Sequence, residues 1–156
     1  MTAAHRRRGA ETERMIVRWA REHGYPGAER TVRTGYRTVE RTLADEGDIA
    51  LCPGLIGQSK ALRPANAAER AVPGWLAETE AQRTAAGAAV GLLIVRRDGT
   101  ADVGEWWAWL YLHDLLETAS GRTPERIAPY PVFAPVRLLV ADAVTLLRGA
   151  GWGEPL

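Results

Sequence analysis

The stretch GDIALCPGLIGQSK, residues 47–60, decides the fold that we expect for this chain. It contains two short apolar runs, Asp48–Cys52 and Leu55–Gln58, and Pro53-Gly54 lies between them. A Pro-Gly pair between short apolar runs favours a hairpin or tight corner between two strands. We therefore expect these two runs to form neighbouring strands of one sheet.

The residues that follow predict a helix and then a buried strand. Residues 62–72 are expected to form a loop, and Pro73-Gly74-Trp75 to open a helix that ends near Ala86, before Gly87. Ala88–Arg96 is an apolar run that ends in one arginine, as is typical of a buried parallel strand. A strand–helix–strand order implies an α/β fold with a mixed sheet and one crossover.

The remaining elements follow from periodicity on either side of this unit. We expect helices over Glu11–His23, His113–Ala119 and Pro135–Gly149, and strands over Thr31–Tyr36 and Trp106–Leu112. At 156 residues the chain is expected to form a single domain. We assign residues 1–112 to its core and residues 113–156 to a C-terminal helical extension of the same domain.

Composition limits the class of protein. Hydrophobic residues make up 46% and charged residues 25% of the chain, which is ordinary for a soluble globular domain. The one cysteine, Cys52, allows no disulfide within the chain, and no apolar run is long enough for a membrane span. The basic N-terminus has no apolar run behind it, so we expect no signal peptide and a cytoplasmic location.

One lysine stands out, because the chain has 19 arginines and only Lys60 as lysine. Alternation along a strand places Gln58 and Lys60 on one face and Ser59 on the other. Asp48, at the start of the neighbouring strand, can face that pair. A carboxylate and an amide oxygen suit Mg²⁺, and a nearby ammonium can orient water and stabilise a phosphate under attack.

Each of these residues also has an ordinary structural interpretation. Taken singly, Asp48 fits turn chemistry, and Lys60 fits a solvated strand end. Glu13 fits a surface acid of an amphipathic helix, and Gln58 a polar residue on an exposed strand face. Other sites are excluded: the three histidines lack zinc spacing, and residues 54–60 lack the Gly-Lys-Ser/Thr of a phosphate-binding loop.

The combination of motifs resembles the PD-(D/E)XK nuclease superfamily. Gly47-Asp48, followed by Gln58-Ser59-Lys60 and then a helix and an apolar strand, resembles its central motif. Residues 9–14, GAETER, resemble the G-x-x-x-E-R that opens the first helix in its Holliday junction resolvases. Trp75–Glu80 and Ala88–Arg97 resemble resolvase-like proteins of actinobacteria and their phages. The resemblance covers roughly residues 9–112.

The resemblance implies a restriction-endonuclease-like fold and a DNA endonuclease that resolves four-way junctions. It assigns Asp48 and Gln58 to a Mg²⁺ site, for which Mn²⁺ can substitute, and Glu13 to completing that site. Lys60 is assigned to positioning the attacking water and stabilising the transition state. The resemblance also implies a homodimer on branched DNA, with no small-molecule cofactor.

Two positions depart from the family pattern. Gly47 stands where the pattern has proline, and Gln58 where it has Asp or Glu. Because glutamine removes one negative charge, Mg²⁺ affinity should be weaker. Glu13 and Asp48 are then the only carboxylates, or a migrated acid contributes. The candidates for a migrated acid are Glu46, Glu78 and Glu80. A further alternative is a decayed site that binds DNA without cutting it, and another is a nuclease for different branched DNA.

Arginines and tryptophans supply candidate DNA contacts beyond this site. Residues 1–45 carry ten arginines against six acids, which can attract a polyanion or merely solvate a helix. The candidate phosphate contacts are Arg14, Arg30, Arg33 and Arg37. Alternation places Trp107 and Trp109 on one strand face and Trp106 on the other, where we expect core or subunit-interface residues rather than a stacking platform.

Overall fold

A computed structural model describes residues 3–31, 48–61, 65–119 and 133–156, with backbone only for residues 3–6 and 65–68. In chain order, its first helix is followed by three strands, and helices and strands alternate after them. They are α1 (Ala3–Glu22), β1 (Glu29–Arg30), β2 (Ile49–Cys52), β3 (Leu55–Lys60), α2 (Ala65–Ala85), β4 (Val90–Val95), η1 (Val103–Glu105), β5 (Trp107–Tyr111), α3 (Leu112–Ala119), β6 (Pro135–Leu139) and α4 (Val140–Gly149).

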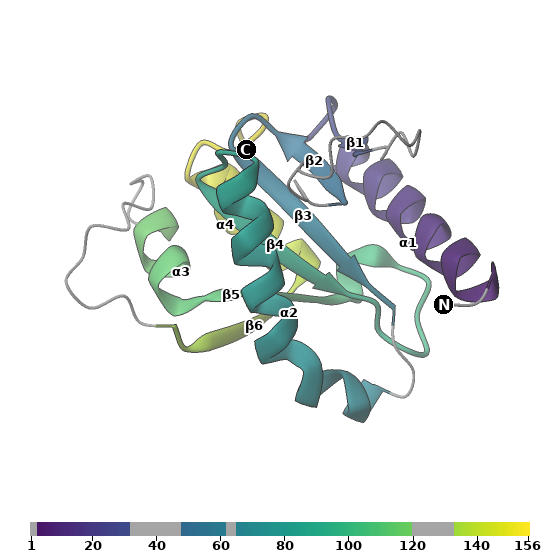
Figure 1. Cartoon of the computed structure of the whole chain (residues 1–156). Helices are drawn as coiled ribbons and strands as arrows, with labels where there is room; N and C mark the ends of the chain where they lie inside the picture. The colour runs from purple at the N-terminus through teal and green to yellow at the C-terminus, as the bar shows by residue number, and fades with distance from the viewer. Residues whose placement is uncertain (1–2, 32–47, 62–64, 120–132) are drawn as a thin grey trace, which may run out of the picture.

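The described strands form one six-stranded mixed sheet in the order β1-β2-β3-β4-β5-β6 (Figure 1). Only β3 and β4 are parallel, and every other neighbouring pair is antiparallel. Helix α2 supplies the connection that parallel strands need. With the four α-helices of the described residues, this is a single α/β domain, as the strand–helix–strand order predicted.

The hairpin between β2 and β3 is confirmed. Ile49 pairs with Gly57 and Cys52 with Leu55, in antiparallel register. Gly54 has a φ of +82°, a left-handed conformation that glycine adopts without steric cost. The apolar run after α2 is also confirmed as a buried strand, because all six residues of β4 are buried and pair in parallel with β3.

The predicted loop over residues 62–72 is wrong from residue 65 onward. Helix α2 begins at Ala65 and continues through Pro73 without a break. The residues before the proline, mostly Ala with Glu and Arg, are good helix formers, and Val72 is buried on the sheet. Burial of Val72 and the helix propensity of the neighbouring residues therefore outweigh the hydrogen bond that Pro73 cannot make.

The predicted C-terminal helix over Pro135–Gly149 is wrong in its first five residues. Residues 135–139 form β6, which pairs with β5, and only Val140–Gly149 is helical. Proline is tolerated at the first residue of an edge strand, because its missing N–H can face away from the ladder. The apolar spacing there suited a helix, but pairing with the Trp-rich β5 decides the conformation.

The other predicted elements differ mainly in their ends. The first helix starts at Ala3, eight residues earlier than predicted, while β5 and α3 match their predicted ranges within one residue. The predicted strand over Thr31–Tyr36 lies outside the described residues except for Thr31, which follows the two-residue β1. No helix in the described part of the chain is both long and apolar enough to cross a bilayer.

The sheet has two differently packed faces. Helices α1 and α4 pack on one face, together with the fully buried Trp106. Helix α2 packs on the other, where Val72 and Leu76 contact Leu93 and Val95. Trp107 and Trp109 are only partly buried against this second cluster, so the predicted division of the three tryptophans between two faces is confirmed.

The C-terminal residues hold the turn of the β2–β3 hairpin. A side chain at Gly54 would come within 2.8 Å of the Trp152 ring, which packs against the core beside it. Tyr25 is buried nearby, and this burial raises the pKa of its hydroxyl well above the usual range. Burial likewise raises the pKa of the Cys52 thiol, opposed by the backbone N–H of Gly153. This packing fixes the strand that carries the candidate site.

Candidate active site between β3 and α2

Strand β3 presents Gln58 and Lys60 to helix α2. The neighbouring positions on β4 are Leu93 and Val95, both part of the cluster under α2. Gln58 is 2% exposed, and the Lys60 side chain is 25% exposed. Sheet alternation thus carries the two polar side chains to the α2 face, one buried and one reaching the surface.

Glu78 of α2 contacts both of these side chains. Its Oε2 atom accepts a hydrogen bond from Lys60 Nζ at 2.7 Å and from Gln58 Nε2 at 3.2 Å. Glu78 is 55% exposed, so its carboxylate lies at the rim of the contact. Lys60 Nζ also lies 5.8 Å from the centre of the Trp75 ring. The helix therefore places a carboxylate beside the one lysine of the chain.

Thr79 holds the other end of the Gln58 amide. Its buried hydroxyl lies 2.7 Å from Gln58 Oε1 and 2.8 Å from the backbone oxygen of Trp75, and it donates to one of them at a time. Because Thr79 and Glu78 engage opposite ends of the amide, its oxygen and nitrogen have fixed directions. Gln58 is buried, not a polar residue on an exposed strand face.

Asp48 lies one residue before β2, and its carboxylate extends to β3. Asp48 Oδ2 accepts hydrogen bonds from the backbone N–H of Ser59 at 2.8 Å and from the Ser59 hydroxyl at 3.3 Å. Since Ile49 pairs with Gly57, Asp48 is the position across from Gln58 in the same register. The Asp48 carboxylate therefore adds a side-chain hydrogen bond to the β2–β3 ladder. Its partner, Ser59, is the residue between Gln58 and Lys60.

Glu13 contacts Arg30 and not the residues of this group. It comes from α1, which packs on the opposite face of the sheet from α2. Its Oε2 atom accepts a hydrogen bond from Arg30 Nε at 2.7 Å and forms an ion pair with Arg30 Nη2 at 2.5 Å. The structure thus pairs two residues for which the sequence predicted separate roles, a metal ligand and a phosphate contact.

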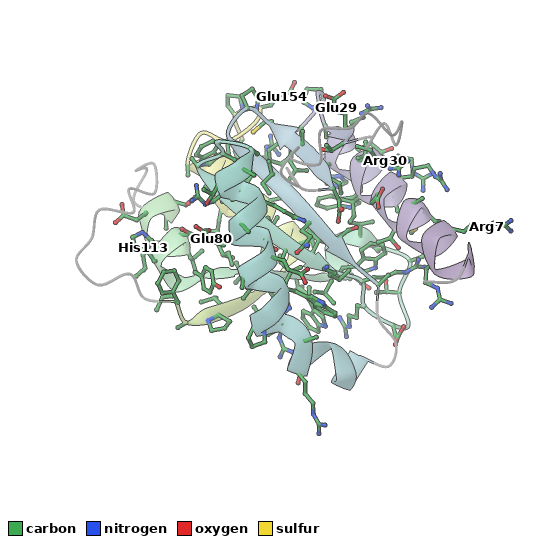
Figure 2. The ribbon with its side chains drawn as sticks, in the orientation of Figure 1. Arg7, Glu29, Arg30, Glu80, His113 and Glu154 are labelled. Carbon is green, nitrogen blue, oxygen red and sulfur yellow. The ribbon has the colours of Figure 1, made fainter. Side chains whose placement is uncertain are left out.

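The remaining predicted residues divide between described and undescribed parts of the chain. Arg14 is exposed on α1, and Glu80 forms an ion pair with Arg83 at 2.9 Å. Figure 2 shows Arg7 pointing outward from the first turns of α1, beyond the folded body. Arg33, Arg37 and Glu46 lie outside the described residues.

The donor set suits Mg²⁺ in its chemistry. Within the described ranges, no three His, Cys, Asp or Glu side chains gather closely enough to hold a metal by themselves. Mg²⁺ does not require such a cage, because it usually binds one or two carboxylates and keeps waters and substrate phosphate as its other ligands. Asp48 and Glu78 are the carboxylates nearest to this group, but Asp48 Oδ2 is bonded to Ser59, and the Gln58 oxygen faces Thr79 while its nitrogen faces Glu78. The donor types suit the ion, and Gln58 would have to turn its amide to offer it an oxygen.

Sequence reasoning missed Thr79 and Trp75 as parts of this group, and offered Glu78 only as one of three candidate acids. A helical wheel could have found them, because residues 75, 78 and 79 share one side of a helix. The helix was predicted to begin at Pro73, whereas it begins at Ala65. The predicted helix therefore did not define which of its sides packs on the sheet.

Comparison with known proteins adds nothing to this geometry: no family model, no curated protein and no solved structure matches the chain.

Proposed function

We propose that this chain is a Mg²⁺-dependent DNA endonuclease of restriction-endonuclease-like fold, with four-way junctions as its substrate. The observation that carries the proposal is the contact of Glu78 with both Gln58 and Lys60. The sequence left the site one carboxylate short at Gln58. Glu78 supplies a carboxylate at that place from the facing helix.

The order of elements supports the proposal. A helix, three antiparallel strands, a second helix and a strand parallel to the third are the elements in which the resemblance locates its motifs. The motif residues fall where two of these strands adjoin, with Asp48 before β2 and Lys60 at the end of β3. This arrangement is what the motif spacing requires, although the Gln58 position departs from the pattern.

Each residue has a chemical role in this proposal. Asp48 and Glu78 are the carboxylates that would hold Mg²⁺, with Gln58 adding its oxygen once the amide turns from Thr79; the bound ion would supply Lewis-acid polarisation of a phosphoryl oxygen. Lys60 orients the attacking water and stabilises the negative charge that develops on the phosphate. Lysine suits this role because its charge is compact and its stem flexible, whereas a guanidinium is broad and planar. Glu13 acts at most by positioning Arg30.

Pairing with Glu78 sets the resting position of Lys60. An ammonium held at 2.7 Å from a carboxylate is fixed in direction before any substrate binds. A substrate phosphate would attract the Lys60 ammonium, and Glu78 would then be available as a ligand for the metal ion. The Lys60–Glu78 ion pair is therefore the arrangement of these two groups before substrate binds.

One observation favours a second candidate, a DNA-binding protein that does not cut. Both ends of the Gln58 amide already have protein partners, so the residue also serves as a structural link between β3 and α2. In this alternative Lys60 contacts DNA phosphates without activating water. A homodimer and a cytoplasmic location stay predictions under either candidate.

A junction-cleavage assay tests the proposal. The purified chain is incubated with a synthetic four-way junction and with Mg²⁺, Mn²⁺ or Ca²⁺ in turn. We expect cutting with Mg²⁺ or Mn²⁺, and none in Lys60→Ala or in Lys60→Met, which keeps the stem that lies beside Trp75. Arg18→Gln, a charge removed from the exposed face of α1, is the matched control and should cut normally.

The results also separate the two candidates. A wild-type chain that binds junctions yet never cuts them with any divalent metal contradicts the enzyme proposal. If Gln58→Glu then creates cutting, the non-cutting alternative is correct. If the chain binds no DNA of any shape, both candidates fail.

A further inference from the structure

The α2 face of the sheet carries a second cationic surface, three strands away from β3. Arg137, on the edge strand β6, lies over two indole rings, at 4.6 Å from the Trp107 ring centre and 5.6 Å from that of Trp109. Arg97, just beyond β4, lies 4.8 Å from the Trp107 ring centre. We call these four residues the Arg–Trp surface.

Strand register relates this surface to the candidate site. One row across the sheet runs Lys60, Val95, Trp107, Leu139, and the next runs Gln58, Leu93, Trp109, Arg137. With neighbouring strands about 4.8 Å apart, β6 lies about 14 Å from β3. The two cationic places therefore share a sheet face and a pair of rows, and lie at the two ends of those rows.

Helix α2 separates the two places. It packs over Leu93 and Val95, the middle positions of the rows. Glu78 of α2 pairs with Lys60, and Glu69 of α2 pairs with Arg137 at 2.7 Å. Nine residues make about 2.5 helical turns, so Glu69 and Glu78 project from opposite sides of the helix. The Arg–Trp surface thus lies along the flank of α2 that faces away from Lys60.

The chemistry of the Arg–Trp surface suits a phosphate backbone. A guanidinium that lies over an indole uses its flat face and keeps its N–H donors, which lie in its plane, for other partners. Arg137 uses one such donor on Glu69, and its side chain is 41% exposed. Two arginines held in this way keep their charges at fixed places, and fixed guanidinium donors match phosphate oxygens.

We propose that the Arg–Trp surface is a second contact for DNA backbone and that it produces a preference for branched over unbranched DNA. The inference rests on the proposed function. A branched substrate offers two backbone segments that diverge, and α2 stands as a ridge between two places that each hold phosphate. One segment lies at Lys60 for cutting, and the other lies against Arg97 and Arg137.

Binding measured without divalent metal tests this inference separately from cutting. Fluorescence anisotropy in EDTA compares a four-way junction with a duplex of the same sequence, for the wild type and for Arg97→Gln/Arg137→Gln. We expect the double variant to lose several-fold in junction affinity and to bind junction and duplex more nearly alike. The slope of log affinity against log salt should fall by about 2, or about 0.9 for each phosphate contact.

Three controls make the result decisive. Arg18→Gln removes one charge from the opposite side of the sheet and should leave the junction preference unchanged. Arg137→Lys keeps the charge but not the planar donors, so it should lose less junction affinity than the double variant. It replaces the double variant in the test if that variant proves unstable. Lys60→Met should fail to cut and, because it removes the phosphate contact at the other place, should lower the salt slope by about 0.9.

Several outcomes would overturn the inference. An unchanged junction preference in the double variant would do so, as would an equal loss in Arg18→Gln. If the double variant differed from the wild type in its mass by sedimentation but not in its affinity for DNA, the Arg–Trp surface would be a contact between two copies of the chain. A wild type that shows the preference but never cuts would remove the proposed function and leave the second contact standing.

Discussion

The two flanks of α2 are built from the same parts and differ in what lies beneath them. On each flank a cation from the sheet reaches a carboxylate of the helix at 2.7 Å, Lys60 to Glu78 and Arg137 to Glu69. Lys60 stands beside the buried amide of Gln58, which Glu78 and Thr79 both hold. Arg137 lies on indole rings at the edge of the sheet.

This difference separates a place suited to chemistry from one suited to binding. Buried polar groups must be matched in direction, so the Gln58 amide sets the positions of its neighbours closely. An indole face fixes only the position of the guanidinium charge and leaves the N–H donors of the guanidinium available to other partners. Burial agrees with this division, because the cation on the first flank is 25% exposed and that on the second is 41% exposed.

Neutralising each helix carboxylate in turn gives the largest expected contrast. Glu78→Gln should lower junction cleavage by about a hundredfold or more, because the site loses the carboxylate that replaces the one missing at Gln58. Glu69→Gln should leave cleavage within a few-fold and tighten DNA binding slightly, since Arg137 is no longer neutralised. Cleavage rates at saturating DNA would measure the first effect, and equal losses in both variants would erase the distinction between the flanks.

Restoring the acid at Gln58 should make the stability of the protein depend on metal. Gln58→Glu places a buried carboxylate against Glu78, and two like charges at that distance destabilise the folded state at neutral pH. We expect a lower unfolding temperature than the wild type in EDTA and a rise on adding Mg²⁺, since an ion that binds only the folded state stabilises it. Thermal unfolding with and without the ion would show this. A variant that is indifferent to Mg²⁺ would argue against a metal site here.

Removing the hydroxyl behind Gln58 should cost stability without any change of charge. In Thr79→Val, Gln58 Oε1 loses the hydroxyl that donates to it inside the fold, which costs about 1–3 kcal/mol. Thr145→Val, which removes an exposed hydroxyl bonded to a carbonyl of its own helix, should change the free energy of unfolding by less than about 0.5 kcal/mol. Urea unfolding of the two variants gives the comparison, and similar costs in both would mean that the amide is not held as described.

Local signals in the sequence were strong where short-range geometry decides the structure. Pro53-Gly54 between two apolar runs predicted the hairpin, and the unbroken apolar run after Gly87 predicted the parallel strand. Alternation from Gln58 to Lys60 correctly placed both on one face. These features depend on residues within a few positions of each other, so a single sequence contains them.

Signals failed where distant segments meet. Residues 65–72 became helical against a proline because Val72 packs on the sheet, and residues 135–139 became a strand because β5 offered them an edge. The place of Glu78 beside Lys60, 18 positions away in the chain, depended on where α2 lies over the sheet. A helical wheel groups residues 75, 78 and 79 on one side of the helix, but no local pattern says which strand that side meets.

By itself the sequence determined the α/β class, the hairpin that carries Gln58 and Lys60, and the placement of these two residues on one strand face. Only the tertiary structure decided that Glu78 and Thr79 enclose Gln58 and that Arg137 reaches Trp107 and Trp109. The physical reason is that strand alternation and turn chemistry act over a few residues. The position of a helix on a sheet follows instead from apolar burial summed along its whole length, which no short motif encodes.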